Sequence, residues 1–366
     1  MSNPRRILLC ATGLSPQIVT ETLYALVVHQ HWIPDEIHLI TTTEGRQRAE
    51  LTLLDADPEQ RMFYRLCEDY GIDATAIRFN PDTIHLIGHD EPLDDIRSPE
   101  DNERAADTIT AVVRTLTADP DSQVHASIAG GRKTMGFYLG YAMSLFGRAQ
   151  DRLSHVLVSA PFESHPQFFF PPRQPRVLYD RSDRPVRTDQ AQIILADIPF
   201  VRLRDGLTEV ICQGGASFSE AVNQAQRALA PPTLVIDLTQ RRIDCGGVVV
   251  SLPPVDFAFY YWLAQRRIKD QPGVCRNQIT PEDTAEFLAA YPATDELSGG
   301  YERVVEAMGS CMEQAYFDSH CSQVNKALRK ALGSSMAQHY VIANDGCRPL
   351  SRYALGLEAG QIRVVG

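Results

Sequence analysis

The chain has 366 residues, of which 44% are hydrophobic and 22% charged, and its formal net charge at pH 7 is -11. This is an ordinary globular composition, and the length is sufficient for two domains with cores of their own. The negative charge argues against a broad electrostatic surface for nucleic acid. No apolar stretch approaches the roughly twenty residues that a membrane span needs. Eight scattered cysteines without a Cys-x-x-Cys pair are typical of free thiols in a reducing cytoplasm, so we expect a cytoplasmic protein without membrane attachment.

Short apolar segments alternate with helical ones between residues 5 and 160, which predicts a parallel sheet covered on both faces. The expected strands are 7–11, 36–41, 74–79, 124–128 and 153–159, and the expected helices are 16–29, 44–70, 99–116 and 134–146. Ligands on such a sheet bind beyond the carboxyl ends of the strands, near a switch in strand order. The predicted fold class is therefore α/β, with a Rossmann-like doubly wound sheet.

A small-residue loop, Thr12-Gly13-Leu14-Ser15-Pro16-Gln17, follows the first expected strand. Pro16 suits the first position of a helix and Ser15 suits the N-cap before it, so capping is one role open to Ser15. A nucleophile elbow would need a glycine two residues on either side of the serine, and Gln17 occupies the second of these positions. The loop therefore does not predict a serine hydrolase.

A second loop, Ala129-Gly130-Gly131-Arg132-Lys133-Thr134-Met135, joins the expected strand 124–128 to a helix. The glycines allow close approach of the backbone to a ligand, and the amides at the helix start favour an anionic oxygen. Arg132 and Lys133 add two cationic donors, although a tight turn with solvated charges is the simpler alternative. The spacing matches neither a P-loop nor a dinucleotide fingerprint, so ATP hydrolysis and NAD binding are not supported. We predict a phosphate site, which Ser15 of the first loop would share if the two strand ends are neighbours.

The pattern becomes irregular after residue 160. Phe168-Phe169-Phe170 and the prolines that follow predict an extended arm or hairpin with an aromatic packing surface, such as one in a dimer, and residues 190–198 predict another strand. A helix over 218–229 then leads to Pro231-Pro232, the predicted domain boundary. The expected domains are residues 1–230, with the arm and linker from about 161, and residues 231–366.

The second domain begins with three short strands, 233–238, 242–245 and 248–252, and a helix over 254–265. A helix over 319–332 and a hairpin that turns at Asn344-Asp345-Gly346 complete it, which predicts a winged helix-turn-helix domain whose order resembles the DNA-binding domains of bacterial response regulators. Its last helix carries the polar and basic residues Gln323, Asn325, Lys326, Arg329 and Lys330, which could contact phosphates and base edges. Residues 231–366 nevertheless hold thirteen Lys and Arg against fifteen Asp and Glu, so DNA binding is possible but not favoured.

Two histidine pairs, His85 with His89 and His29 with His31, could suggest a metal site. Neither pair has a carboxylate or cysteine at a supporting spacing, and isolated histidines are more often surface or core residues. We expect no metal and no cofactor.

The segments Ile7-Leu8-Leu9-Cys10-Ala11-Thr12-Gly13-Leu14-Ser15-Pro16-Gln17 and Ser127-Ile128-Ala129-Gly130-Gly131-Arg132-Lys133-Thr134-Met135 together resemble the CARF domains of CRISPR systems. More narrowly, the chain resembles the ring nucleases of type III systems, in which a winged helix follows the CARF domain. The resemblance implies a homodimer that binds cyclic tetraadenylate in a shared pocket and cuts it into linear diadenylates, which switches off the antiviral signal.

The family's catalytic serine and lysine would correspond to Ser15 and Lys133. The resemblance implies further ligand contacts from Thr12, Gly13, Gln17, Gly130, Gly131, Arg132 and Thr134. Cleavage would need no metal, because the ribose 2′-hydroxyl is already tethered beside the scissile phosphate, and the products would end in 2′,3′-cyclic phosphates.

Two other mechanisms are alternatives to ring cleavage. A HEPN ribonuclease effector would carry an arginine and a histidine separated by four residues, and the chain has no such pair. A cyclic-oligoadenylate sensor that does not cleave the ring, and that regulates transcription through its winged helix, stays open as the alternative.

Overall fold

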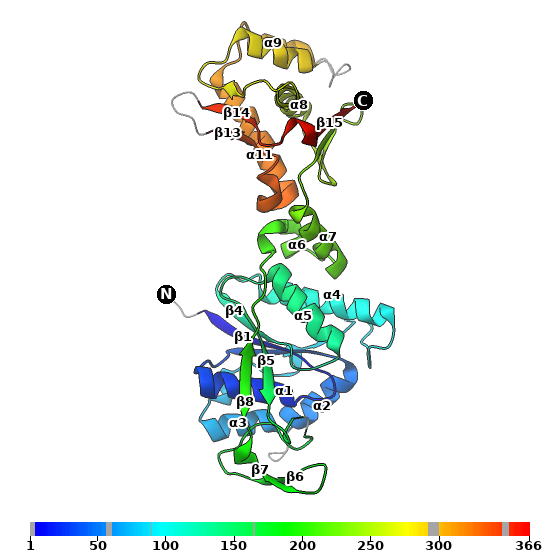
Figure 1. Cartoon of the computed structure of the whole chain (residues 1–366), viewed down its shortest axis with the longest axis vertical. Coiled ribbons are helices and arrows are strands. Elements are labelled where there is room, and N and C mark those ends of the chain that lie inside the picture. The colour runs from blue at the N-terminus through cyan, green and yellow to red at the C-terminus, as the bar shows by residue number, and fades with distance from the viewer. Residues whose placement is uncertain (1–3, 56–60, 89, 164, 292–299, 346–350) are drawn as a thin grey trace. The chain divides into compact units, whose positions relative to one another are not determined.

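The computed structural model describes residues 4–55, 61–88, 90–163, 165–291, 300–345 and 351–366 (Figure 1). They form two compact units, the first of residues 1–204 and 212–221 and the second of residues 205–211 and 222–366. Helix α7 (Phe218–Leu229) carries the chain from the first unit into the second, ahead of Pro231 and Pro232. Each unit has its own hydrophobic core.

The first unit is built on a six-stranded sheet with the order β3-β2-β1-β4-β5-β8. Its strands are β1 (Arg5–Ala11), β2 (Glu36–Thr41), β3 (Ile84–Leu86), β4 (Ser122–Ser127), β5 (Arg152–Val158) and β8 (Ile193–Asp197). Strands β1 to β5 are parallel and β8 pairs antiparallel with β5. The chain builds outward from β1 in one direction and from β4 in the other, so the switch in strand order lies between β1 and β4. The predicted doubly wound α/β sheet is confirmed.

Helices cover both faces of this sheet, which explains why residues 7–11 of β1 are completely buried. The helices are α1 (Gln17–Tyr24), continued by a π-helical turn (Ala25–His29), α2 (Thr43–Leu53), α3 (Met62–Tyr70), α4 (Pro99–Leu116) and α5 (Lys133–Phe146). Figure 1 shows α4 and α5 on one face and α1 to α3 on the other. Leu8 and Cys10 of β1 pack against Val19 of α1 and Phe63 of α3 in the core on the second face.

Two predictions for the region between β2 and α4 are wrong. Residues 74–79 form a short 3-10 turn (Ala74–Ala76) and a single bridge from Arg78 to Glu36, and the third strand of the sheet is the later β3. Ile77 and Phe79 are apolar because they pack on the core from this loop, so their spacing imitates a strand. The helix predicted over 44–70 is two helices, α2 and α3, and residues 56–60 between them lie outside the described part of the chain.

The aromatic run at Phe168 to Phe170 belongs to the core of its own unit, so the prediction of a dimer surface there is wrong. Phe169 and Phe170 join the core between the sheet and α3, and Phe168 packs on Phe162 with ring centroids 5.0 Å apart. A hairpin follows, formed by β6 (Val177–Tyr179) and β7 (Pro185–Arg187).

In its described residues, the second unit contains two small sheets and the helices α8 to α11 around one core. The first sheet has the order β11-β10-β9-β15, and the second has the order β12-β14-β13. The strands are β9 (Leu234–Asp237), β10 (Arg242–Cys245), β11 (Val248–Ser251), β12 (Val274–Cys275), β13 (Ile342–Asn344), β14 (Arg352–Leu355) and β15 (Ile362–Val365). The helices are α8 (Pro254–Ile268), α9 (Pro281–Ala290), α10 (Gly300–Met308) and α11 (Gln314–Ala337), while α6 (Glu209–Gln213) lies at the division between units.

Helix α11 and the hairpin after it carry the predicted winged-helix features. The helical backbone of α11 is interrupted at Gly333, where φ is 75°, so its main part ends at the predicted Leu332. Strands β13 and β14 pair antiparallel, but they are joined by more residues than the predicted tight turn, and its Gly346 lies outside the described residues. The winged-helix assignment itself stays a prediction.

Asn325 of α11 does not have the role predicted for it. The side chain is buried, its amide nitrogen donates to the Ile342 carbonyl at 2.9 Å, and its oxygen accepts from the Ile342 amide at 2.8 Å. Asn325 therefore joins β13 to α11 through these two hydrogen bonds and is not available to contact a base edge.

Candidate functional site at the switch in strand order

The two glycine loops of the first unit lie side by side, because β1 and β4 are neighbouring parallel strands. A Cβ atom added to Gly13 would lie 3.7 Å from the Cα atom of Gly131, which is ordinary van der Waals contact. A Cβ atom added to Gly130 would lie 2.8 Å from both the Ala11 carbonyl oxygen and the Ile18 Cγ1 atom. Gly130 is thus required where the second loop crosses the end of β1 and the start of α1.

A cavity of about 280 Å³ opens between these loops and the carboxyl end of β2. It is lined by Gly13, Leu14, Ser15, Thr42, Glu44, Asp94, Asp95, Ile96, Gly131, Arg132 and Met135. The structure therefore brings Ser15, Gly13, Gly131 and Arg132 to one place, as the phosphate-site hypothesis requires.

Helices α1 and α5 both begin at this edge of the sheet without a side-chain cap. The N-cap of α5 is Arg132, and the Met135 amide donates to the Arg132 carbonyl at 2.9 Å. The amides of Lys133 and Thr134 have no partner among the described residues, so they are open to an anion. The N-cap of α1 is Pro16, so the prediction that Ser15 caps this helix is wrong. Within the described part of the chain the Ser15 hydroxyl makes no hydrogen bond, and the Ser15 carbonyl accepts from Thr12 Oγ1 at 2.9 Å. The hydroxyl is therefore free to contact a ligand.

Thr12 and Gln17, which were predicted to bind ligand, do not line this cavity. Thr12 is completely buried and its hydroxyl is used within the loop, so it shapes the loop and does not reach a ligand. Gln17 is half-buried and its Nε2 donates to the Pro166 carbonyl at 3.5 Å. Its Oε1 is buried and has no hydrogen-bond partner among the described residues.

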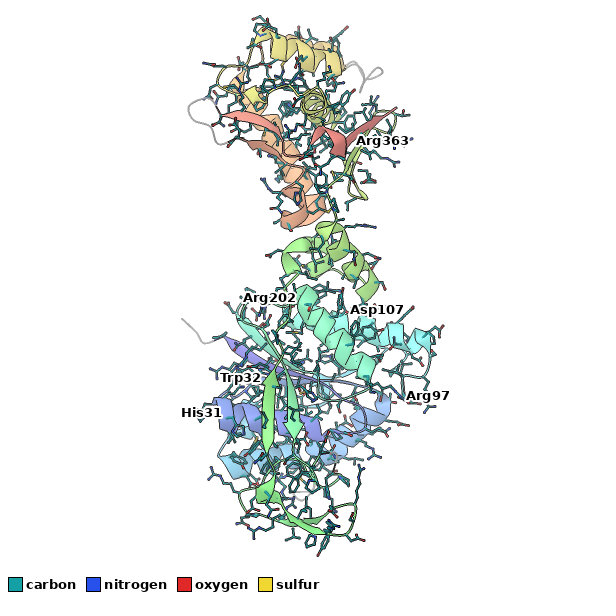
Figure 2. All side chains as sticks on the ribbon, in the orientation of Figure 1. His31, Trp32, Arg97, Asp107, Arg202 and Arg363 are labelled. Carbon is teal, nitrogen blue, oxygen red and sulfur yellow. The ribbon has the colours of Figure 1, made fainter. Side chains whose placement is uncertain are left out.

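Arg132 is held by Asp95 and is not a free phosphate donor. Its Nε donates to Asp95 Oδ1 at 2.8 Å, and its second terminal nitrogen contacts Asp95 Oδ2. This bond is the main reason why the pKa of Asp95 is lowered to about 2, and the carboxylate in turn raises the pKa of Arg132. Arg97, which Figure 2 labels, also donates to Asp95 Oδ2, at 3.3 Å.

Lys133 and Thr134 are exposed in the first turn of α5, beside the cavity. Lys133 has no ion pair or hydrogen bond with any residue that the structure describes, so its ammonium is available to a ligand. It is also the only lysine before Lys269 in the sequence.

Sequence reasoning missed the contribution of α2. A Cβ atom added to Gly45 would lie 2.8 Å from the Gly13 carbonyl oxygen and would collide with Thr41, so the first turn of α2 packs directly on the first loop. This contact places Glu44 at the cavity. A glycine four residues after the end of a strand, closely following a run of three threonines, was the available signal.

The acidic residues Asp94 and Asp95, which follow β3, were also missed. Thr43 donates to Asp94 through its hydroxyl, and its backbone amide donates to the Leu93 carbonyl at 2.9 Å, which ties this segment to the start of α2. With Glu44, the cavity has three carboxylates and one guanidinium, so the helix amides and Lys133 must supply the remaining attraction for an anion.

The histidine pair considered as a metal site is part of a different arrangement. His85 Nε2 lies 2.9 Å from His38 Nδ1, and His38 Nε2 lies 2.8 Å from Glu36 Oε2. Burial lowers the pKa of His85 to about 4, while His89 lies outside the described residues. The described part of the chain contains no cluster of three side chains able to hold a metal ion. Free thiols in the same part of the chain are those of Cys10, Cys67, Cys245, Cys275, Cys311 and Cys321. It contains no helix long and apolar enough to cross a bilayer.

In doubly wound α/β units, ligands bind at the switch in strand order, which is where the two glycine loops of this unit lie. The family model for CRISPR-associated protein NE0113 matches residues 15–231, more than half of the sequence, and the chain belongs to this family. The predicted relationship to CRISPR-associated proteins is thereby confirmed.

Other comparisons add less. No curated protein matches the chain. Among solved structures, it is similar to Enterococcus italicus Csm6 bound to cyclic hexa-2′-fluoro-hexa-dAMP, at 12% sequence identity and a TM-score of 0.29. The match covers 84% of this chain and 55% of the Csm6 chain, so the chain spans little more than half of that relative's length. A likeness this distant says nothing about individual site residues.

Proposed function

We propose that the chain is a ring nuclease that binds cyclic tetraadenylate at the two glycine loops and cleaves it to linear diadenylates with 2′,3′-cyclic phosphate ends. Such an activity would switch off type III CRISPR antiviral signalling. The observation that carries the proposal is the meeting of Gly13 and Gly131 beside the uncapped start of α5. Membership of a CRISPR-associated family and the cyclic oligonucleotide bound to the Csm6 relative support the same ligand class.

The available side chains suit cleavage of a ribose phosphodiester. The ribose 2′-hydroxyl needs only to be held in line with the departing 5′-oxygen, a task for the backbone of the two loops. Lys133 would neutralise charge that grows on the phosphoryl oxygens, and the unbonded Ser15 hydroxyl would orient the ribose or a phosphate oxygen. None of these steps calls on a metal.

We further propose that the active form is a homodimer, because a ring with four phosphates can present equivalent halves to two identical sites. Phe137 supports this, since it is 62% exposed and lies one turn beyond Lys133 on α5. An exposed phenylalanine next to the loops is suited to contact with a second copy. Light scattering with and without the ring tests this directly, and a monomer that holds the ring would contradict it.

The deciding experiment incubates the purified full chain with labelled cyclic tetraadenylate in excess EDTA and separates the products. We expect diadenylate with a cyclic phosphate end from the wild type and a rate about a hundred- to a thousandfold lower from Lys133→Ala. Lys269→Ala, which removes an exposed lysine of the second unit, is the matched control and should cleave normally. A parallel reaction with cyclic hexaadenylate tests ring size. An intact ring after prolonged incubation with wild type would refute the nuclease.

A second candidate function rests on the exposed side of α11. Lys326, Arg329 and Lys330 are exposed on one side of this helix, and within the described residues none of them makes an ion pair. The alternative proposal is therefore a sensor that binds the ring without cutting it and binds duplex DNA through α11. Tight ring binding without cleavage, together with salt-dependent DNA binding that the triple alanine variant loses, would favour this function.

A further inference from the structure

The three carboxylates of the switch-point cavity are not equivalent. Asp95 accepts hydrogen bonds from the guanidinium of Arg132 and from the Ile96 amide, the latter at 2.8 Å. Asp94 accepts from the Thr43 hydroxyl. Glu44 makes no hydrogen bond or ion pair with any residue in the described part of the chain, although it lines the same cavity. Among the described residues, Glu44 is therefore the carboxylate of the cavity whose two oxygens both remain available to a ligand.

The position of Glu44 is set by the backbone. It belongs to the first turn of α2, whose N-cap Thr42 accepts from the Gly45 amide at 3.3 Å. The next residue, Gly45, packs on the Gly13 carbonyl so closely that no side chain fits between them. Glu44 thus stands beside the loop that carries Ser15 and shares the cavity with Gly131 and Arg132 of the loop after β4.

The simplest alternative is that Glu44 merely stabilises α2, because an acidic residue in the first turn of a helix interacts favourably with the helix dipole. That role would not require the residue to line a cavity beside two ligand loops. A first-turn acid on a solvent face would serve that role equally well, and Glu282 of α9 has such a position.

We propose that Glu44 is the general base that removes the proton from the ribose 2′-hydroxyl, an inference that rests on the ring-nuclease function proposed above. The proton passes from the 2′-oxygen to a Glu44 oxygen as the 2′-oxygen forms its bond to phosphorus. The bond from phosphorus to the 5′-oxygen breaks, and the departing oxygen takes a proton from solvent. Glu44 then returns its proton to solvent, so the ring opens to a 2′,3′-cyclic phosphate and a 5′-hydroxyl with no net gain or loss of atoms.

The other side chains at the cavity are poorer bases. An ammonium such as that of Lys133 has no lone pair to accept a proton, and neither does the guanidinium of Arg132. A serine hydroxyl such as that of Ser15 is a very weak base, and no histidine lines the cavity. The charged groups that share the cavity with Glu44 are Asp94, Asp95 and Arg132, and the first is engaged by Thr43 while the other two neutralise each other.

The test compares the wild type with Glu44→Gln and, as a matched first-turn control, Glu282→Gln. Single-turnover cleavage of labelled cyclic tetraadenylate is followed at neutral pH, and ring affinity is measured separately. We expect Glu44→Gln to cleave about a hundredfold or more slowly. Its affinity for the ring should be unchanged or higher, because a negative charge near phosphates has been removed.

The outcomes separate the two proposals. If the wild type cleaves the ring and Glu44→Gln cleaves it at the same rate, the base assignment is overturned while the ring nuclease stands. If the wild type binds the ring without cleaving it, both proposals fall together. Thermal unfolding of each variant shows whether a slower rate reflects lost folding, which a change of one exposed side chain should not cause.

Discussion

Gly130 should be among the least replaceable residues of the first unit. The Cβ atom of a Gly130→Ala variant would lie 2.8 Å from the Ala11 carbonyl oxygen and from Ile18 Cγ1, about 0.6 Å inside ordinary contact. The carbonyl belongs to a central strand, so the second loop or α1 must move instead. Overpacking of this kind destabilises the folded state by about 1–3 kcal/mol. Alanine also lowers the conformational entropy of the unfolded chain, which offsets about 0.4–1 kcal/mol of that loss. We expect a net loss of about 1–2 kcal/mol.

Calorimetry of the full chain measures this effect, because the two units have separate cores. For a unit of this size the loss corresponds to a decrease of about 3–6 °C in Tm of the first unit, with the second unit unchanged. Gly13→Ala is the matched control: its Cβ atom would meet the Cα atom of Gly131 at 3.7 Å, an acceptable contact, so its Tm should stay within about 2 °C of wild type. Equal losses in both variants, or no loss in Gly130→Ala, would refute the packing argument.

Three further predictions concern stability and reactivity. Asp95 has its pKa lowered to about 2 by Arg132, so the pair adds stability that is complete above about pH 5 and is lost as the pH falls through about 2. Because Arg132 is half-exposed, Asp95→Asn should cost only about 1 kcal/mol in urea unfolding at neutral pH, and less as the pH approaches 2. Asn325→Ala leaves the backbone groups of Ile342 unpaired and should destabilise the second unit by about 2–3 kcal/mol, seen as a lower Tm for that unit alone. Burial raises the pKa of the Cys10 thiol to about 12, so peptide mass spectrometry should find it unalkylated in the native chain at about pH 8 and alkylated after denaturation.

The long elements of the first unit were predictable because their signals are local. Helix α4 was predicted at its observed bounds, since Pro99 and the capping box between Ser98 and Asp101 mark its start. Strand β3 could not be predicted in this way, because its three residues are too few to show a period. The loop at Ile77 and Phe79 has a clearer apolar pattern than the true strand. Tertiary packing determines which of the two segments pairs in the sheet, and the local pattern does not show it.

The candidate site was predictable only where a loop carries its own signature. Gly13, Ser15, Gly130 and Gly131 lie in small-residue loops that follow buried strands, and strand adjacency then brings those loops together. Asp95 could not be assigned, because it follows a strand whose position was predicted wrongly. Its ion pair with Arg132 also joins two side chains that are 37 residues apart in the sequence. Such pairings are set by the order of strands in the sheet, which no local pattern encodes.

The position of Lys133 makes the first unit accessible to amine chemistry at a single side chain. No other lysine occurs before Lys269, and this one is exposed at the start of α5. An acylating reagent or a lysine-specific protease should therefore modify or cut the first unit at the candidate site and at no other side chain. Protection of that one residue can report ligand occupancy in the unaltered protein, so binding can be followed for any candidate ring before a single variant is made.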